Sequence, residues 1–146
     1  MAQDTEGRVL IVDDEADFVE ALSARLETRG LTVETAGTGV EAIEHVKVRR
    51  FHAIILDLAM PGMDGIETLR VLRDLSPDVQ VILLTGHGTL QKTVEAMKLG
   101  AMDFLEKPVE LDVLLGRIRE AKTNTDEASE KQAQDLIGEI LLAKGW

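Results

Sequence analysis

The chain of 146 residues contains no cysteine and no tyrosine, and only 3% of its residues are aromatic. Without cysteine, the protein cannot form disulfides, thiolate zinc sites or a cysteine nucleophile. With so few aromatic rings, its core must be built from aliphatic side chains and methionine. Hydrophobic residues make up 45% of the sequence, which is enough for one core. The composition therefore predicts a single globular domain of ordinary size.

Positive charge is also scarce, because 16 Lys and Arg face 27 Asp and Glu, for a net charge of -11. This balance argues against direct binding to nucleic-acid backbones or anionic lipid, which requires clustered basic residues. Residues 1–6 lack the basic-then-apolar pattern of a signal peptide, and no apolar run approaches the length of a membrane span. We therefore expect a cytoplasmic protein that binds neither nucleic acid nor membrane.

Short apolar runs alternate along the chain with segments of helical period. Five strands are expected, at 8–12, 31–35, 53–57, 80–85 and 102–105. Five helices are expected after them, at 17–29, at 39–49, from Asp64 as a plausible N-cap, at 89–99 and at 109–121. This alternation predicts an α/β fold, with a doubly wound five-stranded parallel sheet flanked by five helices.

Residues 122–146 look different from the repeated units. The segment 122–126 is polar and is interpreted as a hinge between a domain at 1–121 and a C-terminal extra helix. That helix is amphipathic, because Ala133, Leu136, Ile137, Ile140 and Leu141 fall at helical spacing. It is expected either to pack on its own domain or to mediate dimerisation or partner docking.

Polar residues stand where the expected strands end. Asp13 and Asp14 follow the first strand, Asp57 ends the third, Thr85 ends the fourth, and Lys107 comes shortly after the fifth. Because the carboxyl ends of parallel strands share one edge of a sheet, these side chains are expected to lie together. Each residue alone is weak evidence, but their joint occurrence in this order indicates a functional site.

Three carboxylates at one edge repel one another unless a pKa rises or a cation lies among them. Mg²⁺ suits oxygen ligands in a site that also holds phosphate. Asp57 is then a candidate nucleophile toward phosphorus. Lys107 and Thr85 would pair with the remaining phosphoryl oxygens.

The segments around these residues resemble receiver domains of bacterial two-component response regulators, of the chemotaxis-regulator type. The matching segments are 9–15 (VLIVDDE), 57–65 (DLAMPGMDG), 84–88 (LTGHG) and 103–108 (DFLEKP), and the resemblance covers residues 7 to 121. It implies a flavodoxin-like receiver fold and phosphorelay signal transduction. In that role Asp57 would receive a phosphoryl group from a sensor histidine kinase or a histidine phosphotransfer protein.

The same resemblance implies how the metal would be held. Asp14 and Asp57 would bind Mg²⁺ through their side chains, and Ala59 through its backbone carbonyl. Asp13 would act mostly through metal-bound water. Ala59 and His87 occupy positions that tune the lifetime of the aspartyl phosphate in relatives.

The resemblance also implies a switch. Thr85 would move toward the phosphoryl group, and Phe104 would turn inward and change a surface that a downstream protein reads. The Lys107–Pro108 bond would be cis. The stretch from Thr85 to Pro108 is most similar to receivers that precede output domains, but we expect no DNA-binding output domain in this chain.

Three alternative functions fit the sequence less well than a phospho-accepting receiver. A Mg²⁺-dependent phosphatase with an Asp nucleophile usually has a second acid two residues later, where this chain has Ala59. A degenerate receiver used only for binding would not need the full acidic set with Thr85 and Lys107. A nucleotide-binding flavodoxin-like protein would carry a glycine-rich fingerprint after the first strand, and none is present. We therefore expect a phospho-accepting switch with slow self-dephosphorylation, rather than an enzyme, that acts on a protein partner, with a homodimer as one option.

Overall fold

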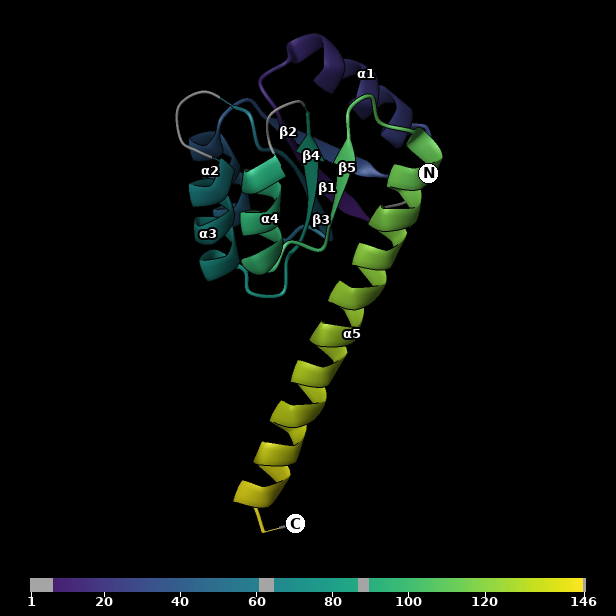
Figure 1. Cartoon of the computed structure of the whole chain (residues 1–146). Coiled ribbons are helices and arrows are strands. Elements are labelled where there is room, and N and C mark those ends of the chain that lie inside the picture. The colour runs from purple at the N-terminus through teal and green to yellow at the C-terminus, as the bar shows by residue number, and fades with distance from the viewer. Residues whose placement is uncertain (1–6, 61–64, 87–89, 146) are drawn as a thin grey trace.

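A computed structural model describes residues 7–60, 65–86 and 90–145 and shows one sheet with helices on both faces (Figure 1). The five strands are all parallel, in the order β2-β1-β3-β4-β5. They are β1 (Arg8–Val12), β2 (Thr32–Ala36), β3 (Ala53–Asp57), β4 (Gln80–Thr85) and β5 (Asp103–Glu106). The helices are α1 (Ala16–Glu27), α2 (Gly39–Val48), α3 (Gly65–Leu75), α4 (Leu90–Lys98) and α5 (Leu111–Ala143). The predicted fold class is confirmed, and the predicted element ends match or lie within two residues of those observed, except at the C-terminal end of α5.

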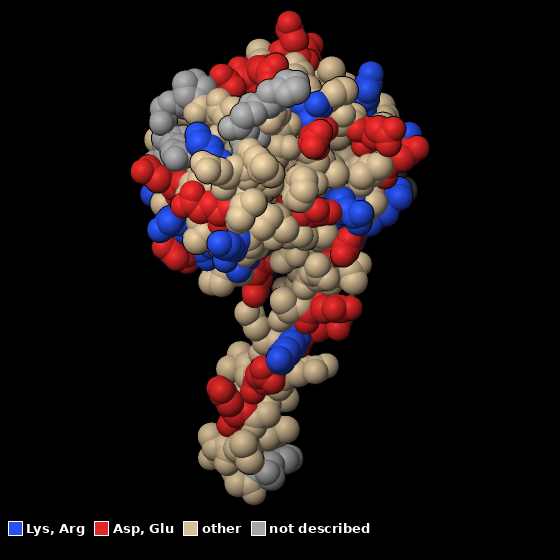
Figure 2. Space-filling view, viewed as in Figure 1, with Lys and Arg blue, Asp and Glu red and all other residues tan. Residues whose placement is uncertain are grey.

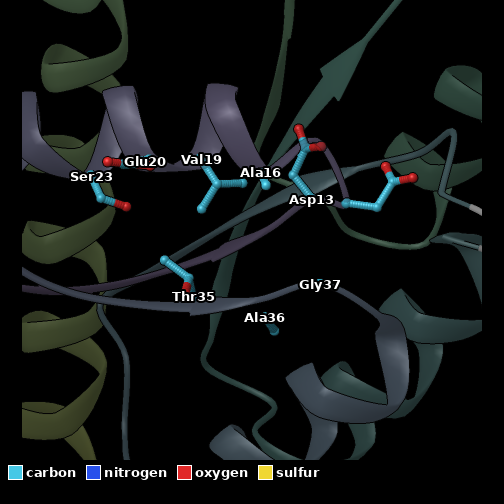
Figure 3. A pocket seen from close by; sticks show the side chains of 9 residues that line it. Asp13, Ala16, Val19, Glu20, Ser23, Thr35, Ala36 and Gly37 are labelled. Atoms are coloured by element: carbon cyan, nitrogen blue, oxygen red, sulfur yellow. The ribbon is translucent and has the colours of Figure 1, made fainter.

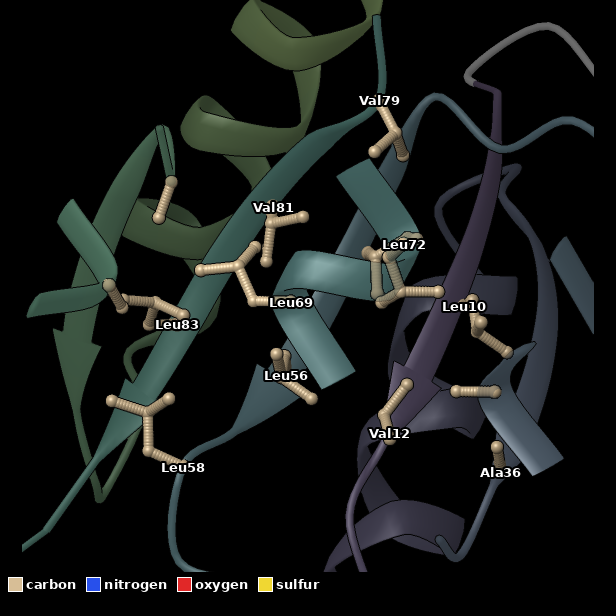
Figure 4. Packing of buried hydrophobic residues seen from close by; sticks show 14 of the residues in the cluster. Leu10, Val12, Ala36, Leu56, Leu58, Leu69, Leu72, Val79, Val81 and Leu83 are labelled. Atoms are coloured by element: carbon tan, nitrogen blue, oxygen red, sulfur yellow. The ribbon is translucent and has the colours of Figure 1, made fainter. Parts of the chain in front are cut away.

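The central strands are buried on both faces, because alternate side chains enter two separate cores. Leu10 and Val12 of β1 face the core covered by α2, α3 and α4. Val9 and Ile11 of the same strand face the core covered by α1 and α5. Figure 4 shows the first core, in which side chains of the strands pack against Leu69 and Leu72 of α3. Burial of each such leucine contributes about 2 kcal/mol, so the sheet is a rigid base for its polar ends.

Glycine allows a close approach where α3 starts beside the end of β3. A Cβ atom at Gly65 would lie 3.0 Å from the backbone Cα of Leu58, which is tighter than nine in ten Cβ contacts in proteins. A larger residue would therefore push α3 away from the loop that follows Asp57. The last residue of α4 is followed closely by Gly100, whose φ of +101° favours glycine and ends the helix.

Helix α5 continues without interruption to Ala143, so the hinge predicted at 122–126 is wrong. The segment is polar, yet no glycine or proline occurs between Gly116 and Gly138 to break the helix. The buried Thr125 hydroxyl donates to the carbonyl of Ala121 at 2.8 Å, one turn earlier. Lys122 and Asp126 form an ion pair at 2.8 Å on the same helix. The extra helix is therefore a continuation of α5, and the division of the chain at residue 121 stays a prediction.

Polar contacts hold the middle of α5 against the end of the sheet opposite the expected site. Asn124 donates to Gln80 at 3.1 Å, and Gln132 donates to Asp78 at 2.8 Å. Beyond these contacts α5 projects from the domain, and Figure 2 shows charged side chains along the projecting part and few at its tip. Four large apolar residues of this part are 41–57% exposed: Leu136, Ile137, Ile140 and Leu141. Although α5 has 33 residues, neither it nor another helix in the described ranges is long and apolar enough to cross a membrane.

Candidate functional site

The strand register brings the predicted polar residues to one edge of the sheet. Val12 of β1 pairs with Leu56 of β3, so Asp13 and Asp57 follow on neighbouring strands. On the other side of β3, the backbone N–H of Lys107 donates to the carbonyl of Thr85 at 2.9 Å. Strand order reverses between β1 and β3, which is where open α/β sheets form their binding sites.

The three predicted acids lie close enough to share one cation. One carboxylate oxygen from each of Asp13, Asp14 and Asp57 lies within 4.8 Å of the others. Asp13 and Asp57 are buried, whereas Asp14 is exposed. Local turns fix one oxygen of each buried acid: Asp13 Oδ1 accepts from the N–H of Glu15, and Asp57 Oδ1 from the N–H of Ala59, both at 2.9 Å. The second oxygen, Oδ2, is left for the chemistry of the site.

Lys107 extends into this acidic cluster. Its Nζ lies 2.8 Å from Asp13 Oδ2 and 3.4 Å from Asp57 Oδ2, and it contacts Glu15 at 2.6 Å. Burial by itself would lower the pKa of Lys107, but the contacts with Asp13 and Glu15 and the charge of Asp57 outweigh it and raise the pKa. The ammonium is therefore a permanent positive charge beside the candidate nucleophile. The Lys107–Pro108 bond is cis, as the resemblance implied.

The surroundings of Asp13 disfavour its ionised form. Burial raises its pKa, and the charge of Asp57 adds to the rise, while Lys107 and the N–H of Glu15 work against it. Its Oδ2 has the Lys107 ammonium as an ionic neighbour at 2.8 Å but no hydrogen bond of acceptable geometry. A buried, unsatisfied carboxylate oxygen beside two other acids is what a hard cation would satisfy.

The donor set fits Mg²⁺. Mg²⁺ prefers oxygen ligands, and the three acids supply carboxylate oxygens that lie within 4.8 Å of one another. Ala59 is exposed and lies in the turn after β3, where its N–H serves Asp57. The predicted role of its carbonyl as a metal ligand stays a prediction.

A cavity of about 440 Å³ opens beside the acids, between the start of α1 and the end of β2. Figure 3 shows Asp13 at its edge, with Val19 and Glu20 of α1 and Thr35 of β2 along its walls. Asp13 and Asp14 line this cavity, whereas Asp57 is not among its lining residues.

The predicted switch residues lie on adjacent strands. Thr85 pairs with Glu106 in the register of β4 and β5, which places Phe104 two residues earlier on β5. The Thr85 side chain is buried, and its hydroxyl donates to the carbonyl of Leu105 at 3.4 Å. Phe104 is 44% exposed, so it faces outward in this structure. His87 and the segment 61–64, including the expected N-cap Asp64, lie outside the described residues.

Sequence reasoning missed two partners of Lys107. Glu15 makes its shortest ionic contact, and the ring of Phe18 lies under the ammonium, 4.5 Å from Nζ to the ring centroid. Glu15 directly follows Asp14, and Phe18 comes three residues later on α1, so both were visible as neighbours of the acids. Only the fold shows that they reach a lysine 92 residues away from Glu15.

Comparison with known proteins agrees with this geometry. The family model described as "Response regulator receiver domain" matches residues 9–119. The response regulator MprA of Mycobacterium leprae is 40% identical over 131 residues, which cover 88% of this chain and 58% of MprA. The transcriptional regulatory protein FixJ of Bradyrhizobium diazoefficiens is 35% identical over 138 residues, which cover 93% of this chain and 67% of FixJ. The chain thus spans little more than half the length of MprA.

A solved structure shows the same architecture. A CheY-like response regulator receiver domain protein from Methanospirillum hungatei superimposes with a TM-score of 0.78 at 30% identity. The match covers 83% of this chain and 97% of the other. The two proteins therefore share their overall fold over most of both chains.

Proposed function

The chain belongs to the family of response regulator receiver domains, and we propose that it is a switch controlled by phosphorylation of Asp57. The observation that carries the proposal is the meeting of Asp13, Asp57 and Lys107 at the ends of three strands. Asp57 Oδ1 is held by the N–H of Ala59, so Oδ2 is the oxygen available to attack. The neighbouring ammonium lies where it can receive a phosphoryl oxygen.

The proposed donor is a phosphohistidine on a histidine kinase or a phosphotransfer protein. Asp57 Oδ2 attacks the phosphorus, the P–N bond breaks, and its electron pair returns to the imidazole nitrogen, which takes up a proton. An acyl phosphate forms on Asp57. Lys107 pairs with one phosphoryl oxygen and the Thr85 hydroxyl donates to another, so that developing charge meets preorganised donors.

Mg²⁺ held by Asp13, Asp14 and Asp57 would offset the repulsion between the attacking carboxylate and the phosphoryl oxygens. The resemblance assigns direct side-chain contacts to Asp14 and Asp57, a carbonyl contact to Ala59 and a water-mediated role to Asp13. The chain's own part is to hold these oxygens in place: the N–H groups of Glu15 and Ala59 orient two of the acids. Slow hydrolysis of the acyl phosphate at the same site is part of the proposal.

The output of the switch is a change of surface that another protein reads. Thr85 is bonded to the strand that carries Phe104, and Phe104 is partly exposed. Val94 of α4 and Val113 of α5 are also exposed, at 47% and 40%. These apolar residues support a protein partner at the face of α4, β5 and α5, and the net charge of -11 disfavours direct contact with nucleic acid. A cytoplasmic location is also part of the proposal.

A homodimer through the projecting part of α5 is a second part of the proposal. Leu136, Ile137 and Ile140 expose an apolar face, and helices in proteins are stabilised mostly by packing of such a face against a partner. Glu130 and Lys144 lie seven residues on either side of Ile137, so an antiparallel pair centred there would place opposite charges together. A second copy of the chain is therefore the occupant that fits this face.

The test of the proposed function is intact-mass analysis after incubation with acetyl phosphate and Mg²⁺, for wild type and Asp57→Asn. One added phosphoryl group is expected on the wild type only, and it should be labile to hydroxylamine as an acyl phosphate. Addition to both proteins would move the acceptor elsewhere. If neither protein is modified, by acetyl phosphate or by a phosphohistidine donor, the function is refuted.

A further inference from the structure

The ammonium of Lys107 is closest to a carboxylate that lies outside the acidic cluster. Its Nζ is 2.6 Å from Glu15 Oε1, 2.8 Å from Asp13 Oδ2 and 3.4 Å from Asp57 Oδ2. Glu15 is not one of the three acids that can share a cation. The lysine that should serve the phosphoryl group is thus paired mainly with the first turn of α1 and its neighbour Asp13.

The carboxylate of Glu15 does not cap the helix that it begins. Glu15 is the N-cap residue of α1, but its side chain makes no capping hydrogen bond. This agrees with the preference of N-caps for the shorter Ser, Thr, Asp and Asn side chains. Three residues later, the ring of Phe18 lies 4.5 Å from the same ammonium. The start of α1 therefore holds Lys107 by an ion pair on one side and an aromatic ring on another.

The free-energy cost of removing the Lys107 ammonium differs among its three carboxylate partners. The side chain of Asp13 is fully buried and that of Asp57 is 8% exposed, so water cannot readily replace the ammonium there. The side chain of Glu15 is 61% exposed, so water can solvate its carboxylate when the lysine leaves. Glu15 is the contact that a phosphoryl oxygen can displace at the lowest cost.

We propose that Glu15 is a positioning residue that holds the Lys107 ammonium beside α1, closer to its own carboxylate than to Asp57 Oδ2, until a phosphoryl group takes its place. The inference rests on the proposed phosphorylation of Asp57. The ion pair stabilises the resting state only, because Lys107 must give it up to bind the phosphoryl oxygen. Glu15 therefore slows phosphorylation and shortens the lifetime of the acyl phosphate.

The variant Glu15→Gln removes the charge and keeps the length of the side chain. Phosphorylation by acetyl phosphate is expected to become about two- to fivefold faster, and the acyl phosphate to last about two- to fivefold longer, the range for an exposed ion pair. Glu15→Asp keeps the charge on a shorter side chain and should lie between Glu15→Gln and wild type. Glu20→Gln is the matched control, because Glu20 is exposed on the same helix and no ion pair joins it to Lys107 among the described residues.

A second readout needs neither metal nor phosphate. Metal-free protein is treated with an amine-reactive reagent at neutral pH, and the modification of Lys107 is measured by peptide mass spectrometry. Glu15→Gln removes the shortest ionic contact of the Lys107 ammonium, so Lys107 should react faster in this variant than in wild type and Glu20→Gln.

Outcomes separate this inference from the proposed function. Wild type that takes up no phosphoryl group would refute the function, whereas the labelling still reports on the contact. Wild type that is phosphorylated, with Glu15→Gln equal to Glu20→Gln in rate, lifetime and labelling, would overturn the role of Glu15 alone. Faster phosphorylation in both variants to the same extent would assign the effect to general charge and equally overturn it.

Discussion

The hydroxyl of Thr85 donates a hydrogen bond to the backbone carbonyl of Leu105, at 3.4 Å, across the last two strands of the sheet. Leu105 directly follows Phe104, whose side chain is 44% exposed. If Thr85 turned toward a phosphoryl group on Asp57, it would lose this contact with β5. The hydrogen bond therefore links the phosphorylation site to the strand that carries the proposed switch aromatic.

Phosphorylation is expected to change the environment of Phe104, and Thr85→Ala should uncouple the two. The chain has three phenylalanines, so fluorinated phenylalanine gives three NMR signals. The Phe104 signal should shift on phosphorylation of the wild type, whereas the buried Phe51 serves as an internal reference. In Thr85→Ala, Asp57 should still be modified while Phe104 keeps its resting signal. An unchanged Phe104 signal in phosphorylated wild type would contradict this coupling.

Asp13→Asn is expected to stabilise the metal-free protein at pH 7, by on the order of 1 kcal/mol. The pKa of Asp13 is raised in the folded state by burial, so its ionisation costs stability as the pH rises from the unfolded value of 3.8 through the folded one. The ion pair between Asp13 and Lys107 has the opposite effect on stability, because it stabilises the charged form of Lys107 in the folded protein and raises its pKa. Lys107 keeps Glu15 and Asp57 as partners in the variant, so we expect the burial of Asp13 to decide the sign.

Urea unfolding with and without Mg²⁺ measures this effect. Wild type should gain stability from Mg²⁺, and Asp13→Asn should gain much less. If the variant is less stable than wild type without metal, the ion pair between Asp13 and Lys107 outweighs the cost of burying the Asp13 carboxylate.

Asp126→Asn is expected to destabilise the protein at pH 7 by about 0.5 kcal/mol, the scale of an exposed ion pair. The hydrogen bond from Lys122, with a further contribution from His52, lowers the pKa of Asp126 below its usual 3.8. A lowered pKa means that the stabilisation is present above pH 3.8 and is lost as the pH falls through the folded value. The difference from wild type should therefore shrink below about pH 4. Asp135→Asn, an equal charge change on the exposed projecting part of α5, serves as the control and should have little effect at either pH.

Substitution of the exposed face of α5 is expected to change the oligomeric state. Light scattering after size-exclusion chromatography should show a dimer for wild type and a monomer for the double variant Ile137→Ser, Ile140→Ser. Val48→Ser is a matched control, since Val48 is 75% exposed on α2 and lies away from that face. A wild type that is monomeric at high concentration would contradict the homodimer.

The edge of the sheet could be predicted from the sequence because buried parallel strands are continuous apolar runs that end abruptly in polar residues. The run 53–56 followed by Asp57 is such a case, and the confirmed register places Asp57 beside Asp13. The roles of Asp14, Ala59, Thr85 and Lys107 as ligands or donors remain predictions. The sequence pattern predicts where in the fold these residues lie, but it does not show what they bind.

Two features depend on contacts between distant residues and could not be read from local patterns. The polar segment 122–126 was interpreted as a hinge, but Thr125 is buried and its hydroxyl also donates to the carbonyl of His52 at 3.3 Å, so tertiary contacts hold the helix there. In the sequence, Glu15 stands out only as the last residue of the segment 9–15, and nothing in that segment indicates its ionic partner. Its pairing with Lys107 needs β1 and β5 to lie in one sheet, with their carboxyl ends at the same edge.

Borohydride trapping identifies the residue that carries the phosphoryl group, which we assign to Asp57. The wild type is incubated with acetyl phosphate and Mg²⁺, reduced with borohydride, digested and sequenced by mass spectrometry. Borohydride converts an acyl phosphate on aspartate into homoserine, so we expect homoserine at position 57 and unmodified aspartate at positions 13 and 14. Homoserine at position 13 or 14, or none in protein that has gained a phosphoryl group, would contradict the claim.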